Sequence, residues 1–482
     1  MVKRVLCLAM YCVFLFLFSF VSLSVLFGQV GYTYNLVGLF ALVVIVVVGI
    51  VLLIRRIPTD CALYRQESMW FPLALTLFLL LQLLAGWSLR FESAFDFAAV
   101  YKGAVAWAET GTFVDFYDYF DWFPNNLGAM TFLSIFFKFA KWIGIRDYFF
   151  VGVLVNSVMA TFTLRYAYLI VRKMTAQNSP AGIAVLLFFM LNPACYMVGA
   201  AFYTDALSML FPVMFYYYYL CFKKGERSKR SLVLMSLAGA VGILIKSTVL
   251  IMVVAVLIDA LMNRHFRKMV HILAGVVAMF VLFSGAMHGC LYTKHLDRDL
   301  AARKNTPIGH WIMMGLNQNS QGAYNGEDYV FTRSFEDPDV RDAAIRKEIQ
   351  TRLKTAGVSG TTRLVTVKLT KAFGDGTFAL SDFLDDGPLR NSWLHSYVLY
   401  DSPSYWLYKY CTQVPLLVVY FFVLVAGWNR FRKMSFEIAP FVAIIGLMLF
   451  LAFWESSSRY FLNFVPVIYC IGALGIDQIR KH

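Results

Sequence analysis

Residues 89–147, LRFESAFDFAAVYKGAVAWAETGTFVDFYDYFDWFPNNLGAMTFLSIFFKFAKWIGIRD, lie between two strongly hydrophobic runs and decide how the rest of the chain is arranged. The stretch opens with an acid between two aromatic residues, Phe95-Asp96-Phe97. Its carboxylates before the closing hydrophobic run are Glu92, Asp96, Glu109, Asp115, Asp118 and Asp121. The whole chain carries a formal net charge of +14, so this local excess of acid requires an explanation.

The composition assigns the chain to a membrane. Of its 482 residues, 60% are hydrophobic and 17% are aromatic, and the mean hydropathy of +0.64 is too high for a water-soluble protein of this length. Lys and Arg collect in the cytoplasmic loops of membrane proteins, so the basic charge predicts topology and not a nucleic-acid partner. The cysteines do not form the pattern of a disulfide framework, although Cys290 and Cys411 flank the largest loop and could pair.

The hydrophobic segments predict an all-α polytopic membrane protein with about twelve transmembrane helices. The first run, Val5 to Phe27, follows MVKR and is long enough to span, so we expect a retained helix and not a cleaved signal. The predicted spans are 5–27, 36–54, 69–87, 148–171, 182–200, 206–222, 231–245, 247–262, 269–292, 412–428, 438–454 and 460–477.

The hydrophobic run Leu127 to Ile143 is the point on which the topology depends. If this run crossed the membrane, the basic clusters later in the chain would have to lie outside, whereas all of them fall inside if it lies on the outer surface. The run is short and contains Lys138 and Lys141, so we expect a surface or re-entrant helix. This choice places both termini in the cytoplasm and the active site on the extracytoplasmic side.

These assignments divide the chain into five parts. They are N-terminal transmembrane helices (1–87), a first catalytic outer loop with juxtamembrane helices (88–147), central transmembrane helices (148–292), a small extracytoplasmic segment (293–410) and C-terminal transmembrane helices (411–482). Within the fourth part, RDAAIRKEIQTRLKTAG predicts a helix that stops at Gly357. That part is too small for an independent enzyme domain, and we expect it to cover the outer ends of the spans.

Charged residues at the outer turns are the strongest functional signal. Asp96 follows the third span, Asp205 lies in the turn FYTDAL, and Lys246 divides two hydrophobic runs in ILIKST. Glu455 and Arg459 lie in FWESSSRYFLNF, between the last two spans. Taken singly, each could be a solvated turn residue, and Asp96 could be a helix N-cap. Together they predict a site, because charges near a membrane are costly and are usually paired or functional.

This ordered set of residues resembles the GT-C superfamily of polyprenyl-phosphate-dependent glycosyltransferases, which includes oligosaccharyltransferases, protein O-mannosyltransferases and lipid A aminoarabinose transferases. The resemblance covers residues 90–480 and consists of the order and sidedness of the charges, since no single motif is specific. GHWIMMGLNQNSQGAYNGED (309–328) and FGDGTF (373–378) are also similar to sequences of multispanning proteins of bacterial envelope-polysaccharide pathways. An additional N-terminal span departs from the superfamily and leaves the role of residues 1–60 open.

The resemblance implies an integral membrane glycosyltransferase that moves a sugar from a polyprenyl-phosphate donor to an acceptor hydroxyl at the outer face. Asp96 matches the family's catalytic base, and one base opposite the leaving group implies inversion at the anomeric carbon. Lys246, Arg459 and Tyr460 would hold the donor phosphate, with Glu455 positioning Arg459 one helical turn away. The acceptor would be a glycan, lipid or protein of the cell envelope.

Further polar residues are candidates for catalysis or for contacts with the acceptor or sugar. Asp205 would orient the acceptor or a cation. The acceptor or sugar candidates are Glu109, Asn125, Asn126, Tyr203 and His310. The two asparagines could instead cap the surface helix, and a lone histidine such as His310 more often has a structural role.

A metal ion is not required by the resemblance, so we expect no required cofactor. Asp96, Glu109 and Asp205 could supply oxygen ligands for Mg²⁺ or Mn²⁺, as in oligosaccharyltransferases, but none of the three belongs to a paired acidic motif. The expected partners are the lipid-linked donor, the acceptor and membrane lipids.

A lipid-linked sugar flippase or transporter is the alternative function. Such a protein would also be basic, aromatic and polytopic, but it should carry charges along a path through its spans and often contains an inverted repeat. Here the charges gather at one face and no repeat is evident, so a transferase is favoured.

Overall fold

The computed structural model describes residues 2–28, 34–58, 61, 66–384 and 387–480, and its regular secondary structure in these ranges is helical apart from one isolated β-bridge. The N-terminal helices are α1 (Val2–Phe27), α2 (Leu36–Arg56) and α4 (Glu67–Ser88). The first outer loop contains α5 (Phe95–Thr110), η1 (Val114–Phe116), α6 (Tyr117–Trp122), η2 (Pro124–Asn126) and α7 (Leu127–Trp142).

The central helices and the second outer segment follow. The central helices are α8 (Tyr148–Met174), α9 (Ala181–Met190), α10 (Ala194–Met197), α11 (Thr204–Ser208), α12 (Leu210–Lys223), α13 (Ser228–Ile245), η3 (Ser247–Val249), α14 (Leu250–Met262) and α15 (Phe266–Lys294). The outer segment contains α16 (Arg298–Lys304), α17 (Ile308–Gly315), α18 (Gly326–Arg333), α19 (Pro338–Phe373), α20 (Leu380–Leu384) and α21 (His395–Val398). The chain closes with α22 (Tyr405–Arg432), α23 (Ala439–Phe453), η4 (Ser458–Phe464) and α24 (Val465–Arg480).

The predicted all-α polytopic fold is confirmed. Among the described residues, eight helical stretches are long and apolar enough to cross a membrane: those of α1, α2, α4, α8, α13, α15, α22 and η4–α24. Three shorter apolar stretches coincide with α9, η3–α14 and α23, and α12 lies in the remaining predicted span. The span predicted at 182–200 is not one helix. Helix α9 ends at Met190 because Pro193 disfavours helical geometry in the residue before it.

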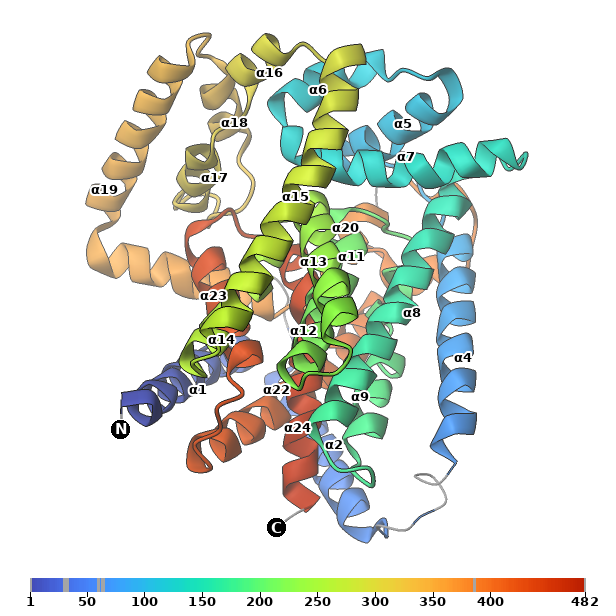
Figure 1. Cartoon of the computed structure of the whole chain (residues 1–482), viewed down its shortest axis with the longest axis vertical. Coiled ribbons are helices and arrows are strands. Elements are labelled where there is room, and N and C mark those ends of the chain that lie inside the picture. Colours follow the sequence, from blue (N-terminus) through green and yellow to red (C-terminus); the bar gives the residue numbers. More distant parts are fainter. Residues whose placement is uncertain (1, 29–33, 59–60, 62–65, 385–386, 481–482) are drawn as a thin grey trace.

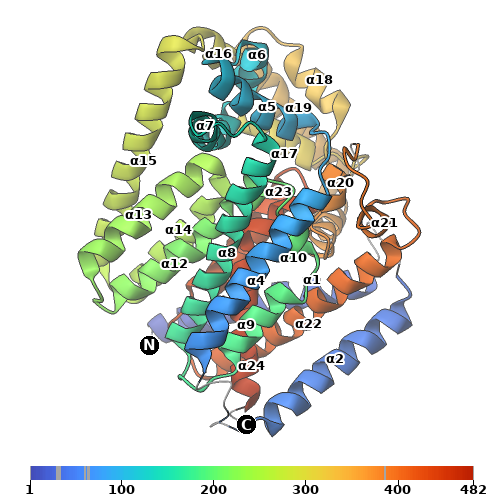
Figure 2. The same ribbon diagram turned by 90° about the vertical axis from the view of Figure 1, so that its right-hand side faces the viewer.

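Helix α7 lies across the bundle and does not run with the spans. In Figure 1, α4 and α8 follow the long axis while α7 crosses over their upper ends, and Figure 2 shows α7 end-on. This arrangement agrees with the surface helix predicted for 127–143. The α5–α7 region and α16 form what we call the upper end, and both chain ends lie toward the opposite, lower end. The cytoplasmic position of both termini stays a prediction from charge.

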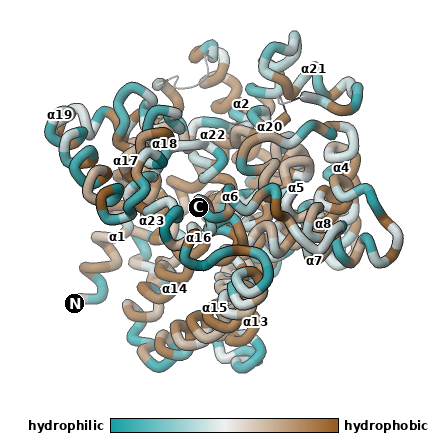
Figure 3. Tube along the Cα trace, turned by 90° about the horizontal axis from the view of Figure 1, so that it is seen from above, coloured by the Kyte–Doolittle hydropathy of each residue, from teal (hydrophilic) through white to brown (hydrophobic). Residues whose placement is uncertain are grey.

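Helix α19 continues past the stop that the sequence predicted. Gly357 has φ 60° and ψ −171°, a conformation outside the helical region, and the helix resumes beyond it. Glycine tolerates this conformation because it has no Cβ. The result is a kinked helix that stands at one side of the structure beside α17 and α18 (Figure 1), and α19 is mostly hydrophilic in contrast to α13 and α14 (Figure 3).

The two outer segments are joined, although the sequence treated them as separate parts. Residues 90–92 pair with residues 387–389 around an antiparallel bridge between Phe91 and Pro388, with two backbone hydrogen bonds of 2.9 Å. Residues nearly three hundred positions apart thus form one upper layer. Cysteine pairing plays no part in this link, because Cys290 and Cys411 are both free.

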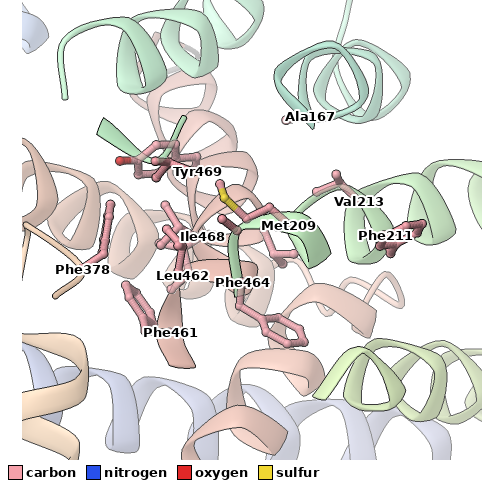
Figure 4. Close-up of a cluster of buried hydrophobic side chains, with 14 of the residues drawn as sticks. Ala167, Met209, Phe211, Val213, Phe378, Phe461, Leu462, Phe464, Ile468 and Tyr469 are labelled. Carbon is pink, nitrogen blue, oxygen red and sulfur yellow. The ribbon is translucent and has the colours of Figure 1, made fainter. Parts of the chain in front are cut away.

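The last span forms the centre of the bundle. Figure 4 shows Phe461, Leu462 and Ile468 within a cluster of buried hydrophobic side chains. A Cβ at Gly475 would lie 1.9 Å from the carbonyl oxygen of Phe422, so a glycine is required where α24 crosses α22. The turn that leads into this span is also buried, with Glu455, Ser456 and Ser458 each at most 6% exposed.

Candidate active site

Asp205 lies in a cluster of charges toward the upper end of the bundle. The side-chain nitrogen of Lys246 is 2.7 Å from Oδ1 of Asp205, and Nε of Arg459 is 4.0 Å from Oδ2. Asp205 is only 3% exposed, and a buried carboxylate is stable only when it is paired. The structure thus brings together three of the residues singled out in the sequence, from α11, the α13–η3 junction and η4.

Lys246 reaches this cluster because helix α13 ends immediately before it. Its backbone is extended, with φ −151° and ψ 114°, and η3 begins at the next residue. The ammonium group lies 4.5 Å from the centre of the Tyr460 ring and 3.4 Å from Oγ1 of Thr204. The predicted break between two hydrophobic runs is therefore what directs this cation inward.

Arg459 and Glu455 are not one helical turn apart, so the predicted helical spacing between them is wrong, whereas a role of Glu455 in positioning Arg459 stays a prediction. Residues 455–457 are not helical, and η4 begins at Ser458. Glu455 instead accepts a hydrogen bond from the hydroxyl of Tyr460 (3.1 Å). The serines that follow Glu455 explain the break, because serine side chains compete for backbone hydrogen bonds and favour turns.

The guanidinium group of Arg459 is held by aromatic rings. It lies 5.5 Å from the ring centre of Tyr203 and 5.3 Å from that of Tyr460, distances at which a cation is attracted to a ring face. Nε of Arg459 and both carboxylate oxygens of Asp205 are buried, and none of them makes a hydrogen bond of good geometry within the described residues. The contact between them is therefore electrostatic, which leaves the Nε–H of Arg459 able to donate to a bound anion.

Asp96 belongs to the first turn of α5, and the N-cap is Ala94, so Asp96 is not the cap. The hydroxyl of Tyr119 donates to Oδ1 of Asp96 (2.9 Å), and Nδ2 of Asn126 donates to the Tyr119 hydroxyl (2.6 Å). Burial, with the Asp96 charge as a further cause, raises the pKa of Tyr119 well above its usual value. Tyr119 therefore stays protonated and holds one oxygen of the carboxylate.

Asn125 and Asn126 enter the site through this hydrogen-bond chain. Nδ2 of Asn125 donates to Oδ1 of Asn126 (3.3 Å), and Nδ2 of Asn126 donates to the hydroxyl of Tyr119. Asn126 occupies the N-cap position of α7 but makes no side-chain capping bond. Of the two alternatives left open by the sequence, capping is thus wrong, and contact with a sugar stays a prediction.

Phe95 has two unusual features beside Asp96. Its φ of 50° lies in the left-handed region, which is unfavourable for a residue with a Cβ, and its side chain is 86% exposed. Strained backbone of this kind is common where a functional side chain must be aimed in a particular direction. Here the strained residue is the first of α5 and directly precedes Asp96.

Tyr203 and Glu455 connect Asp96 to the cationic cluster. Tyr203 is buried and lies within electrostatic range of Asp96, Asp205 and Arg459. Glu455 is likewise within range of Asp96, Arg459 and Lys246. The carboxylate of the first outer loop and the cations of the later spans therefore share two neighbours, Tyr203 and Glu455.

Glu109 lies elsewhere. It is at the opposite end of α5 from Asp96, about 20 Å away at 1.5 Å per residue. Its carboxylate contacts Arg146 at 2.5 Å and accepts a hydrogen bond from the Tyr148 hydroxyl. Glu109 thus fastens α5 to the start of α8, and its assignment to the acceptor site and to a metal site is not supported by its position.

His310 is also engaged elsewhere. It is 1% exposed, and its Nδ1 lies 2.7 Å from Oγ1 of Thr332, a contact that joins α17 to α18. Burial lowers the pKa of His310 to about 4, so the ring is neutral at neutral pH. These contacts match the structural role that a lone histidine more often has.

The arrangement does not favour a metal ion at the proposed pair of Asp96 and Asp205. Among the described residues, no group of three or more His, Cys, Asp or Glu side chains is placed to hold one. Asp205 already faces two cationic side chains, which would repel a divalent cation. We assign no chemical step to a metal.

Three residues near the site were not identified from the sequence: Tyr119, Lys368 and Asp375. Lys368 had a signal, because it is a charge in the hydrophobic pattern LVTVKLT and is 0% exposed in the structure. Tyr119 lies in FYDYFDWF among other aromatic and acidic residues, and no local pattern distinguishes it.

Comparison with known proteins supports a membrane protein. A family described as "Conserved hypothetical integral membrane protein" matches residues 2–479. No curated protein matches the sequence. Among solved structures, ArnT from Cupriavidus metallidurans, bound to undecaprenyl phosphate, is similar with a TM-score of 0.39 and 10% identity, over 85% of this chain and 78% of that chain.

Proposed function

The chain belongs to the conserved hypothetical integral membrane protein family, and we propose that it is a glycosyltransferase that uses a polyprenyl-phosphate-linked sugar. The observation that carries the proposal is the pair of cations, Lys246 and Arg459, gathered on buried Asp205 beside an aromatic wall. A flexible ammonium and a planar guanidinium together suit a phosphate group. Their position within a bundle of apolar helices suits a phosphate that is attached to a lipid.

Asp205 keeps this pair of cations inside the protein before the donor binds. Lys246 is held at 2.7 Å, whereas Arg459 stays at 4.0 Å and is not hydrogen-bonded through Nε. An arriving phosphate would bind the guanidinium fork of Arg459 and share Lys246 with Asp205. As the phosphate leaves the sugar its negative charge grows, and these contacts strengthen, which lowers the barrier.

Asp96 is the proposed base. Tyr119 holds Oδ1, so Oδ2 is the oxygen that takes the proton from the acceptor hydroxyl. The acceptor oxygen forms a bond to the anomeric carbon as the bond from that carbon to the phosphate oxygen breaks, and the bonding electrons leave with the phosphate. Attack opposite the leaving group inverts the anomeric carbon. The acceptor class we propose is a glycan, lipid or protein of the cell envelope.

The sidedness of the reaction follows from charge. The clusters Arg172-Lys173, Lys223-Lys224, 263–268 and 429–433 all lie at or next to the ends of spans. Basic loops favour the cytoplasm, which would place them with both termini inside and the site at the extracytoplasmic face.

The test is a transfer assay on the purified protein in lipid nanodiscs. A panel of polyprenyl-phosphate sugars is supplied with cell-envelope acceptors, and release of polyprenyl phosphate is measured. Asp96→Asn should lower the rate by about 10²–10⁴-fold while leaving donor binding nearly unchanged, because the amide cannot take the proton. A wild-type rate in this variant would exclude Asp96 as the base. Movement of intact donor between the leaflets without its cleavage would favour the flippase.

A further inference from the structure

We propose that the second outer segment positions the turn formed by residues 452–458, hereafter the site turn, and that Asp375 and Lys368 are the residues that do so. The role in transfer rests on the proposed function, whereas the positioning of the turn can be measured without it. The site turn carries Glu455 and leads directly into Arg459. Its own backbone is neither helix nor strand from 455 to 457, so contacts from elsewhere must define its shape.

Lys368 holds the beginning of the site turn. It lies in the second arm of α19, is 0% exposed, and donates to the carbonyl oxygens of Ala452 (2.9 Å) and Gly315 (2.8 Å). One ammonium group thus binds the last turn of α23 and the end of α17 together. Burial lowers the pKa of Lys368 to about 8. One carbonyl acceptor lies at the end of each of these two helices, and this suits the cation because helix C-termini carry partial negative charge.

The middle of the site turn is bound to the loop after α17. The backbone N–H of Ser456 donates to the carbonyl oxygen of Gly322 (2.7 Å). Gly322 has a φ of +73°, and a Cβ on it would come within 2.7 Å of Cδ of Lys368. A glycine is therefore required at the point where loop, turn and lysine meet. This loop belongs to the segment 309–328, in which the sequence predicted a role only for His310.

Asp375 holds the end of the site turn. It lies in FGDGTF, is 6% exposed, and accepts a hydrogen bond from Oγ of Ser458 (2.7 Å). Its two oxygens also accept from the hydroxyl of Thr377 (2.6 Å) and the backbone N–H of Ala379 (2.8 Å). Ser458 is the residue before Arg459, so this bond fixes the chain immediately before the guanidinium group.

The FGDGTF loop shows strain of the kind found at functional positions. Phe378 and Ala379 have φ values of 58° and 54°, in the left-handed region, and neither is a glycine. Two adjacent residues in this conformation are unfavourable, and the bonds made by Asp375 compensate for them. The loop is thus preformed to present a carboxylate to Ser458.

These anchors explain why the site depends on a segment that contributes neither cation. A guanidinium that must bind phosphate through two parallel hydrogen bonds needs a defined position, and small displacements of a catalytic group reduce rates strongly. Loss of an anchor should therefore alter donor binding and transfer more than it alters the stability of the bundle.

The experiment compares hydrogen exchange in the full-length protein in nanodiscs. Asp375→Asn and Ser458→Ala should each speed amide exchange in residues 455–464 by at least tenfold, with little change at 246–250. The matched control is Asp259→Asn, since Asp259 is also buried and accepts from Tyr219 (2.5 Å), Lys223 (2.8 Å) and the N–H of Ile438 (3.0 Å), but it lies near the lower end. This control should leave exchange at 455–464 unchanged.

Binding of farnesyl phosphate to the same variants gives a second measurement. Asp375→Asn should weaken it about tenfold, and the Asp375→Asn/Ser458→Ala double variant should be no weaker than the worse single variant. Unchanged exchange at 455–464, or an equal rise in the Asp259 control, would overturn the inference. If Asp375→Asn does not fold, Ser458→Ala decides alone. If the wild type transfers no sugar and exchange still rises at 455–464, the proposed function fails and the positioning role stands.

Discussion

Replacing Lys246 by Met should destabilise the protein and abolish donor binding, and the two effects should be separable. Asp205 is 3% exposed and its carboxylate lies 2.7 Å from the Lys246 ammonium group. At an effective dielectric constant of about 20, that distance corresponds to about 6 kcal/mol of attraction. Desolvation of the pair offsets much of this energy. Loss of one partner from a buried pair nevertheless costs about 3–5 kcal/mol, because the other charge is left uncompensated.

The double variant Lys246→Met/Asp205→Asn removes both charges and should recover the free energy of unfolding to within about 1–2 kcal/mol of wild type. Unfolding in SDS–detergent mixed micelles measures this quantity. The double variant should still not bind farnesyl phosphate, since the donor site has lost one of its two cations. Wild-type stability in Lys246→Met would refute the buried ion pair. Recovery of both stability and phosphate binding in the double variant would show that Lys246 is only structural.

Three further outcomes are expected. Arg459→Lys should weaken farnesyl phosphate binding and slow transfer without altering acceptor binding, because ammonium lacks the guanidinium fork; an acceptor-only defect in separate titrations would contradict this. Single cysteines at Val114 and Val330, both exposed, should react with an impermeant maleimide from outside intact cells, and one at Arg267 only after permeabilisation; the reverse pattern would invert the topology. The pKa of His310 is about 4 in the folded protein and 6.5 in the unfolded chain, so between these pH values the folded protein binds fewer protons. The stability that neutral His310 contributes is therefore present above pH 6.5 and lost toward pH 4. That loss amounts to about 3 kcal/mol, and His310→Gln should flatten the acid limb of a melting-temperature profile.

Hydropathy and charge were sufficient to predict the architecture. The twelve predicted spans all contain helix, and the surface position of α7 followed from Lys138, Lys141 and the distribution of basic loops. Two local features of the sequence also predict where the structure departs from the expected helices. Pro193 predicts the early end of α9, and the serines after Glu455 argue against the helical pairing with Arg459.

The candidate site was predictable only where a charge interrupts an apolar pattern. Lys246 and Asp205 stood out for that reason, and they are paired in the structure. Glu109 was included because it is near Asp96 in the sequence, but the two lie at opposite ends of one helix. Tyr119 and Asp375 act through contacts with residues 23 and 83 positions away, and no local pattern encodes such partners.

The order of the site residues along the chain has a consequence for biogenesis. Asp205 and Lys246 are made early and can pair as soon as their helices meet in the membrane, which neutralises two charges that would each be costly alone. Arg459 arrives only with the final span, which is also the most buried one. A chain interrupted before that span would therefore hold the Asp205–Lys246 pair without the guanidinium group, so insertion of the last helix is the step that both closes the bundle and completes the pair of cations.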